Sequence, residues 1–265
     1  MISAMTSARA LSLKHLLLPK EHGSWSLAFE PVVLMLLVAP SAAGAALAVA
    51  ACAGFFTRRP LKLALTLPPA DPRRSPSRTA AILFALLAGA ALAGAPWLGS
   101  LRLLWPLLLV APFGALFLWF DLRNAMREAE AELAGSAAFA LLPAAGAILA
   151  GWPVPAALAL AALTFARSVP TVLTVRTYLR LGKGESTSAL PPLAAVTAAL
   201  ALVAYLAFQG LVPAAAVGLS AVLWTRTGWL LSGLRPNWPA RKVGIMEAVL
   251  GVIQLGILTA AYHLR

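Results

Sequence analysis

The residues best suited to chemistry are polar groups inside or beside long apolar runs. Glu30 lies well inside the first such run, and His22, Ser26 and Glu30 follow one another at the spacing i, i+4, i+8. This spacing places the three side chains near one face of a helix. A carboxylate within a membrane is costly, and such groups usually face the protein interior or a wet cavity. We therefore expect this face to be turned inward.

Arg167 is the corresponding base, and it also lies within an apolar run. Pro170 follows three residues later, and a proline removes one backbone donor and frees the carbonyl group of Ala166. An arginine beside a broken helix indicates an anion-binding cavity lined by polar backbone. The alternative is that Arg167 pairs with Glu30 and holds two helices together. The two interpretations are compatible.

A basic stripe follows at the end of the same run. Arg176, Arg180 and Lys183 are spaced at i, i+4 and i+7, so they share a helix face. If the stripe faces lipid, it binds anionic headgroups or sets topology. If it faces inward, it binds a phosphate or diphosphate. The first interpretation is the simpler one, and both stay open.

The acidic residues offer a further candidate site. Glu128 and Glu132 are one helical turn apart and could hold a divalent cation or accept arginines. No compact Asp-rich motif accompanies them, so pairing with Arg123, Arg127 or a base of the neighbouring loops is the expected outcome.

The last apolar run carries a stripe of small and polar residues around Glu247. Such stripes allow helices to approach closely, and we expect Glu247 to pair with Lys242 or Arg241. Arg226, in the preceding run, is expected to snorkel towards the aqueous surface. The lone Cys52 is expected to be a small buried apolar residue.

The composition decides the class of protein that carries these groups. Of the 265 residues, 61% are hydrophobic and only 11% are charged, whereas a soluble domain carries roughly 25% charged residues. The net charge of +12 does not indicate nucleic-acid binding, because the basic residues concentrate in alternate loops, as the positive-inside rule requires. The three histidines are too scattered for a zinc or haem site, and we expect no metal and no cofactor.

A helix needs about 20 apolar residues to span a membrane, and several runs approach this length. We expect an all-α polytopic protein with one transmembrane domain over residues 1–265. Its N-terminus is expected in the cytoplasm, its C-terminus outside, and its first run retained in the mature protein. The loop 68–77 is expected to be extended and solvated. The nine predicted spans are 24–40, 42–57, 79–95, 103–120, 131–150, 155–175, 192–209, 213–231 and 243–262.

The segment PKEHGSW, residues 19–25, resembles the N-terminal motif of the YwiC-like family of bacterial integral membrane proteins. The later segments RSVPTVLTVRTYLR and ARKVGIMEA also look like that family. The resemblance implies a multi-pass protein of the bacterial inner membrane. It implies a family, but no particular biochemical activity.

A more distant resemblance is to the UbiA-type prenyltransferases. It implies nine transmembrane helices and a site formed by the cytoplasmic loops after the second and sixth helices, here residues 58–78 and 176–185. The two Asp-rich motifs that hold Mg²⁺ in that superfamily are absent, since Asp71 and Glu185 are the only acids in these loops. Arginines alone could still hold a diphosphate, because their fork matches phosphate oxygens.

The sequence thus predicts a cytoplasm-facing polar cavity that binds an anionic lipid or isoprenoid-type ligand, with membrane lipids as the other partners. The alternatives are a small-solute or anion transporter built around Glu30 and Arg167, or an accessory subunit of a membrane complex. The oligomeric state stays open. The candidate ligand-binding residues are Lys20, Glu21, His22, Trp25, Glu30, Arg58, Arg59, Glu128, Glu132, Arg167, Arg176, Arg180 and Glu247.

Overall fold

The computed structural model describes residues 23–98, 105–123, 125 and 128–265, and every regular element within these residues is helical. The predicted all-α fold is confirmed, and each of the nine predicted spans falls on a helix or, for 131–150, on a pair of helices. The elements are α2 (Gly23–Val38), α3 (Ala42–Thr66), α4 (Arg74–Gly94), the 3₁₀ turn η1 (Ala95–Leu98), α5 (Trp105–Leu122), α6 (Ala129–Ala140), α7 (Leu142–Leu149), α8 (Val154–Gly182), α9 (Leu190–Phe208), α10 (Ala215–Leu231) and α11 (Ala240–His263).

Six stretches of the described chain are long and apolar enough to cross a membrane. They are α4, α5, the α6–α7 pair, α8, α9 and α11. The pair is interrupted at Leu141, one residue before α7, where Pro143 in the first turn of α7 lacks a backbone donor. Helix α8 has 29 residues, or about 43 Å at 1.5 Å per residue, which exceeds the roughly 30 Å of the hydrocarbon core. Helix α8 is therefore longer than a crossing perpendicular to the membrane requires.

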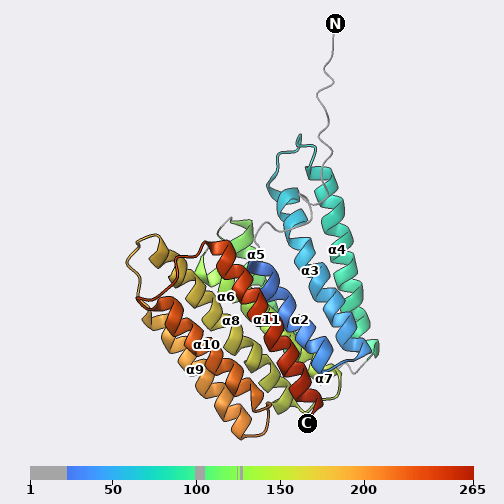
Figure 1. Ribbon diagram of the computed structural model, residues 1–265. Helices are drawn as coiled ribbons and strands as arrows, with labels where there is room; N and C mark the ends of the chain where they lie inside the picture. The colour runs from blue at the N-terminus through green and yellow to red at the C-terminus, as the bar shows by residue number, and fades with distance from the viewer. Residues whose placement is uncertain (1–22, 99–104, 124, 126–127) are drawn as a thin grey trace.

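Helix α2 lies at the centre of the bundle. It packs against α11 on one side and against α7, α6 and α3 on the other. Figure 1 shows α2 and α11 side by side, with the α3–α4 hairpin to one side and α8, α9 and α10 to the other. Gly146 of α7 allows the close approach to α2, because a Cβ there would lie 2.2 Å from the sulfur of Met35. Elements far apart in the sequence thus meet at α2.

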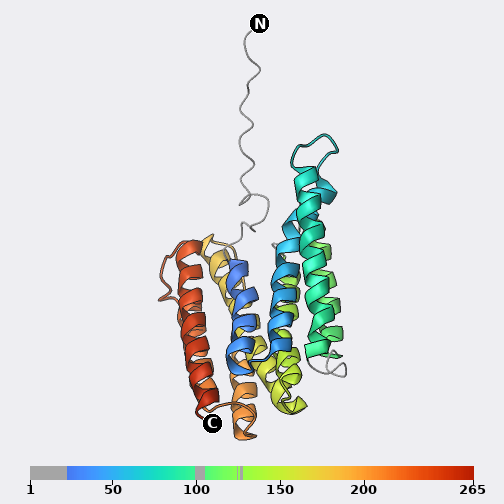
Figure 2. The same ribbon diagram turned by 90° about the vertical axis from the view of Figure 1, so that its right-hand side faces the viewer.

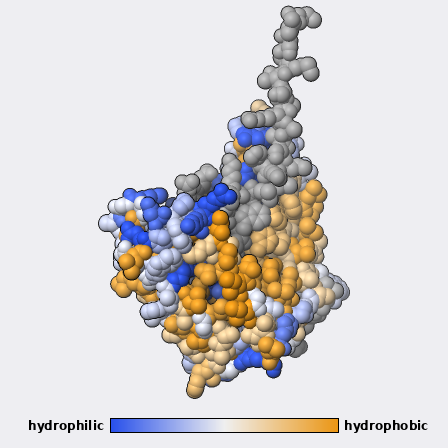
Figure 3. Space-filling model, in the orientation of Figure 1, coloured by the Kyte–Doolittle hydropathy of each residue, from blue (hydrophilic) through white to orange (hydrophobic). Residues whose placement is uncertain are grey.

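The connections between helices divide between two ends of the bundle. The basic connections α3–α4, α8–α9 and α10–α11 lie at the upper end in Figures 1 and 2, and the C-terminus lies at the opposite end. The face in Figure 3 is hydrophilic at this upper end and largely apolar below it. This arrangement agrees with the alternating charge of the loops, and the assignment of the basic end to the cytoplasm stays a prediction.

Two predicted boundaries were wrong. Helix α3 continues through Pro60 to Thr66, and α4 already begins at Arg74, so the loop 68–77 is shorter than expected. The two helices pack against each other along their length, and this packing outweighs the one hydrogen bond that Pro60 removes.

The short remaining loop is organised by Asp71. Its carboxylate accepts hydrogen bonds from the backbone and guanidinium of Arg73, and these lower the pKa of Asp71 from 3.8 to about 2. The loop is therefore held by a local turn and is not simply extended.

Candidate functional site

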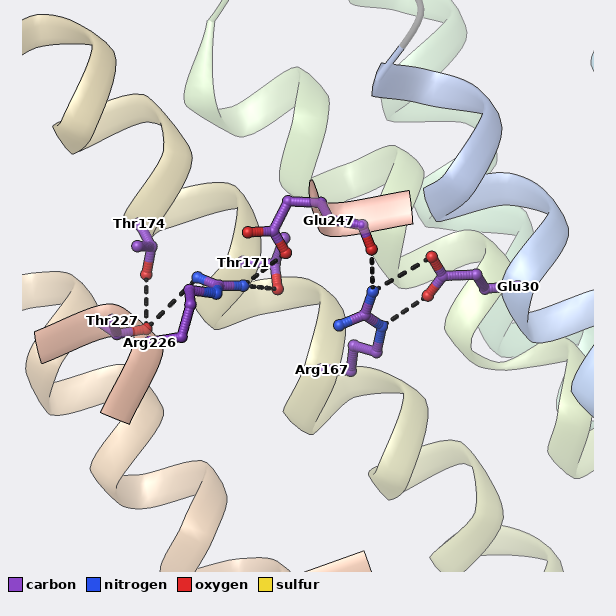
Figure 4. A network of polar contacts seen from close by, with 7 residues as sticks. All are labelled: Glu30, Arg167, Thr171, Thr174, Arg226, Thr227 and Glu247. Atoms are coloured by element: carbon purple, nitrogen blue, oxygen red, sulfur yellow. Dashed lines mark hydrogen bonds and ion pairs between the residues drawn. The ribbon is translucent and has the colours of Figure 1, made fainter. Parts of the chain in front are cut away.

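Glu30 and Arg167 form an ion pair in the interior of the bundle (Figure 4). The Nε of Arg167 donates to Oε2 of Glu30 at 2.6 Å, and its Nη2 donates to Oε1 at 3.2 Å. The two donors engage both oxygens, which is the bidentate geometry that suits arginine and carboxylate. The pairing expected from the sequence is confirmed, and it joins α2 to α8.

A second ion pair lies beside the first and corrects two predictions. The Nη2 of Arg226 donates to Oε2 of Glu247 at 2.6 Å and to Oγ1 of Thr171 at 3.0 Å. Glu247 therefore does not pair with Lys242 or Arg241, and Arg226 does not snorkel, because the whole residues Arg226 and Glu247 are only 7% and 6% exposed. Arg226 lies on α10 and Glu247 on α11, and the two side chains point at each other. The partner of Glu247 is therefore on a neighbouring helix and not on its own.

The two pairs are joined into one network. Arg167 also donates from Nη2 to the backbone carbonyl of Glu247 at 2.9 Å. On the other side, Arg226 Nη1 lies 3.4 Å from Oγ1 of Thr227, which in turn lies 3.2 Å from Oγ1 of Thr174. We call Glu30, Arg167, Arg226 and Glu247 the charged tetrad. It connects α2, α8, α10 and α11, and its two acids and two bases give a formal charge of zero.

Pro170 lies one turn from Arg167 and does not break α8. The helix runs without interruption from Val154 to Gly182. The expectation of a broken helix at this point was therefore wrong. The side chains of Arg167 and its ion-paired partners, not an exposed helix end, supply the polar groups here.

A cavity of about 580 Å³ lies between α2, α6, α8 and α11, next to the charged tetrad. Most of its wall is apolar, and four phenylalanines contribute to it: Phe29, Phe55, Phe117 and Phe139. Three members of the tetrad line it as well, namely Glu30, Arg167 and Glu247. The cavity thus combines a hydrocarbon-like wall with charged groups at membrane depth.

A third ion pair also lines this cavity. Arg176 Nη1 lies 3.2 Å from Oε2 of Glu132, and the two side chains are 28% and 36% exposed. This pair is more exposed than the tetrad and marks the more open part of the cavity. Glu132 therefore pairs with Arg176 of α8 and not with Arg123 or Arg127, the two nearer bases named among its expected partners. Arg123 instead lies over the ring of Trp119 at 3.9 Å, and Arg127 lies outside the described residues.

Three other candidates among the described side chains, Glu128, Arg180 and Arg59, are not among the residues that line the cavity. Glu128 is exposed at the start of α6, and Arg180 pairs with Glu185 at 2.8 Å on an exposed surface. Arg59 is half-buried on α3. Lys20, Glu21 and His22 lie outside the described residues, and of Trp25 only the helical backbone is described.

Arg58 takes part in a separate charged cluster that the sequence did not reveal. Its Nε donates to Oδ2 of Asp121, and Lys62 Nζ donates to Oδ1 of the same carboxylate at 2.9 Å. The guanidinium also lies over the ring of Phe117, 4.9 Å from its centre. One signal was present: Asp121 ends one apolar run and Arg58 ends another, both next to basic loops.

The fold and the site define a polytopic, all-helical membrane protein with a charge-neutral ion network in its interior. Residues 18–145, a little under half of the chain, match the family model described as YwiC-like protein, and they include the PKEHGSW motif, so the resemblance read from that motif is confirmed. The matched part includes Glu30, Arg58, Asp121 and Glu132, whereas Arg167, Arg226 and Glu247 lie beyond it. No curated protein and no solved structure matches the chain.

Proposed function

We propose that this membrane protein binds an amphipathic anionic ligand, such as an isoprenoid or another lipid, in the cavity between α2, α6, α8 and α11. The observation that carries the proposal is a mostly apolar cavity lined by two arginines, Arg167 at depth and Arg176 at the more exposed part. A prenyl or acyl chain suits the phenylalanine wall, and guanidinium groups suit a carboxylate or phosphate head.

The size of the cavity supports this ligand class. Its volume of about 580 Å³ lies within the roughly 300–1,000 Å³ typical of pockets for small ligands. Apolar pockets with a few polar groups bind by burying hydrocarbon surface, while the polar groups fix the orientation of the ligand. In this protein the arginine side chains would fix the position of the head.

The residues of the two basic loops do not fit the magnesium–diphosphate centre that a UbiA-type enzyme would need. Asp71 is bound to Arg73 and Glu185 to Arg180, so the single acid of each loop is engaged by a neighbouring base. Within the part of the chain that the structure describes, no three His, Cys, Asp or Glu side chains gather in a group that would hold a metal. We therefore propose binding, without a metal-dependent prenyl-transfer step.

One observation favours a second function, the transport of a small solute or anion. The charged tetrad lies at membrane depth and contributes three residues to the cavity wall. Ionisable groups in such positions often mark the path of an ion or a proton. Transport requires access from both sides of the membrane, whereas a lipid binder needs access from one side. Flux of a labelled anion into proteoliposomes distinguishes the two functions.

Binding of geranylgeranyl diphosphate to the purified protein in detergent tests the first function. Geranylgeraniol, which has the same tail and no anionic head, should bind more weakly. Removal of a charge-assisted hydrogen bond costs about 1.5–3 kcal/mol, so Arg176→Ala should weaken diphosphate binding roughly ten- to hundredfold.

Arg180→Ala is the matched control. Arg180 lies one turn from Arg176 and also pairs with a glutamate, but it is not among the described residues that line the cavity. Its loss should leave binding unchanged. Equal affinity for the diphosphate and the alcohol, or equal effects of the two substitutions, would contradict the proposal.

A further inference from the structure

Arg167 has a hydrogen-bonding capacity that its neighbours leave unused. Glu30 accepts from Nε and Nη2, and the carbonyl of Glu247 accepts from Nη2. Nη1 is buried and has no hydrogen-bond partner within the described part of the chain, and the residue as a whole is 7% exposed. A donor without an acceptor is expensive inside a membrane. A ligand head with two or three oxygens would supply the missing acceptor.

Glu30 is the most exposed member of the tetrad. Its side chain is 17% exposed, against 8% for Arg167, 6% for Arg226 and 8% for Glu247. It is also one of the residues that line the cavity. A ligand in the cavity therefore reaches the carboxylate of Glu30 more readily than the second ion pair.

Charge balance determines what must accompany an incoming anion. The tetrad is neutral in the structure, with two carboxylates and two guanidinium groups. An additional negative charge would leave a net charge of −1 in a medium of low dielectric constant, where an uncompensated charge is costly. Protonation of one carboxylate restores neutrality, and Glu30 is the carboxylate that the anion would replace.

We infer that Arg167 is a second anion-binding position in this cavity, where an anionic ligand head takes the place of Glu30 while Glu30 takes up one proton from water. No covalent bond forms or breaks: the guanidinium exchanges one oxyanion partner for another, and the proton binds a carboxylate oxygen of Glu30. This inference rests on the proposed function, because it places a ligand in the same cavity.

Several other charged groups on the helices around Glu30 have partners of their own. Arg226 remains bound to Glu247, and on α6 and α8 Glu132 and Arg176 form the third pair. Helix α7, which also packs against α2, carries no charged residue. On α3, Arg58 and Lys62 are bound to Asp121, and Arg59 is half-buried. Near the end of α2, the ring of His263 on α11 lies 2.9 Å from the carbonyl oxygen of Leu37. We assign the proton to Glu30 because it is the carboxylate that the incoming anion displaces from Arg167.

A monoanionic probe makes the proton count unambiguous. We choose farnesyl sulfonate, because its head keeps one negative charge across the physiological pH range, and methanesulfonate as the same head without a tail. Calorimetric titration of the full-length protein at pH 7 in Tris and in bis-Tris, two buffers with different ionisation enthalpies, gives the number of protons taken up on binding. We expect about one proton per farnesyl sulfonate, and hence about tenfold weaker binding for each unit rise in pH.

Two variants separate this inference from the proposed function. Glu30→Gln keeps the shape of the side chain without its charge, so binding should become independent of pH and, at pH 8, tighter than in the unmodified protein. Arg176→Ala removes the outer arginine and should retain the proton uptake.

The outcomes are distinct. Binding of farnesyl sulfonate without proton uptake, and with the same pH profile in Glu30→Gln, overturns the inference and leaves the proposed function standing. Absence of farnesyl sulfonate binding also overturns it, and geranylgeranyl diphosphate then decides the proposed function separately. Equal binding of methanesulfonate with proton uptake supports the exchange at Arg167 and contradicts an amphipathic ligand.

Discussion

Gly251 of α11 lies directly against the carboxylate of Glu30 on α2. A Cβ at position 251 would lie 2.0 Å from Oε1 of Glu30 and 2.9 Å from Nη2 of Arg167. The ion pair therefore occupies the space that a side chain at this position would need. The contact explains why a small residue stands at this point of α11, where the sequence indicated only a general stripe of small residues.

Gly251→Ala is accordingly expected to destabilise the protein. The added methyl group must displace the Glu30 carboxylate and thereby break its bidentate contact with Arg167, and overpacking of this kind costs about 1–3 kcal/mol. Thermal unfolding in detergent measures the effect. Gly256→Ala on the same helix is the control, because a Cβ there meets no atom within 4 Å in the described structure. A loss of stability in the control equal to that in Gly251→Ala would contradict this account.

Glu30→Ala should lower stability more than the loss of an exposed acid does. The substitution leaves Arg167 buried without its carboxylate, and breaking a buried pair costs about 3–5 kcal/mol. Glu185→Ala is the comparison, since Glu185 pairs with Arg180 at the surface, where ion pairs contribute about 0–1 kcal/mol. Thermal unfolding of both variants under one condition decides the matter, and equally small effects would show that Glu30 is solvated.

The partner of Glu247 can be tested in the same way. Arg226→Ala leaves Glu247 as a buried, unpaired carboxylate and should again cost about 3–5 kcal/mol. Lys242→Ala removes a cation that lies over the ring of Trp238, 4.4 Å from its centre, and should cost about 1 kcal/mol or less. If chemical or thermal unfolding ranks the two substitutions in the opposite order, the pairing of Glu247 with Arg226 is wrong.

Topology follows from the distribution of basic residues. A reporter inserted at residues 68–77 should be found in the cytoplasm, and one fused after Arg265 should be found outside it. The structure places these two points at opposite ends of the bundle (Figure 1). Reporters for protease access or enzymatic activity give the answer, and detection of both on the same side would exclude the nine-span arrangement.

The sequence predicted the helical fold well because each long apolar run carries its own signal of length and composition. It also predicted the pairing of Glu30 with Arg167, since two opposite charges at membrane depth have few other partners. It misassigned Glu247 and Arg226, because local spacing favoured Lys242 and Arg241, whereas the actual pair forms across the packing of α10 and α11. Ion pairs between two helices depend on how each helix is rotated about its axis. The spacing of residues along one helix does not determine that rotation.

The same limit applied to the other charged residues. For Glu132 the expected partners were Arg123, Arg127 or a base of the neighbouring loops, and the partner is Arg176 of α8. Arg58 was grouped with the basic loop, but it is 6% exposed and bound to Asp121. In both cases the sequence identified an ionisable residue, but the particular partner depends on how the helices pack.

The most direct test of the central claim is a structure of the full-length protein, purified in lipid nanodiscs and supplied with geranylgeranyl diphosphate. We predict ligand density in the cavity between α2, α6, α8 and α11, with the tail against Phe55 and Phe139 and the head within hydrogen-bonding distance of Arg176 or Arg167. A cavity that stays empty at saturating ligand, or ligand density only on the outer, lipid-facing surface of the bundle, would contradict the claim.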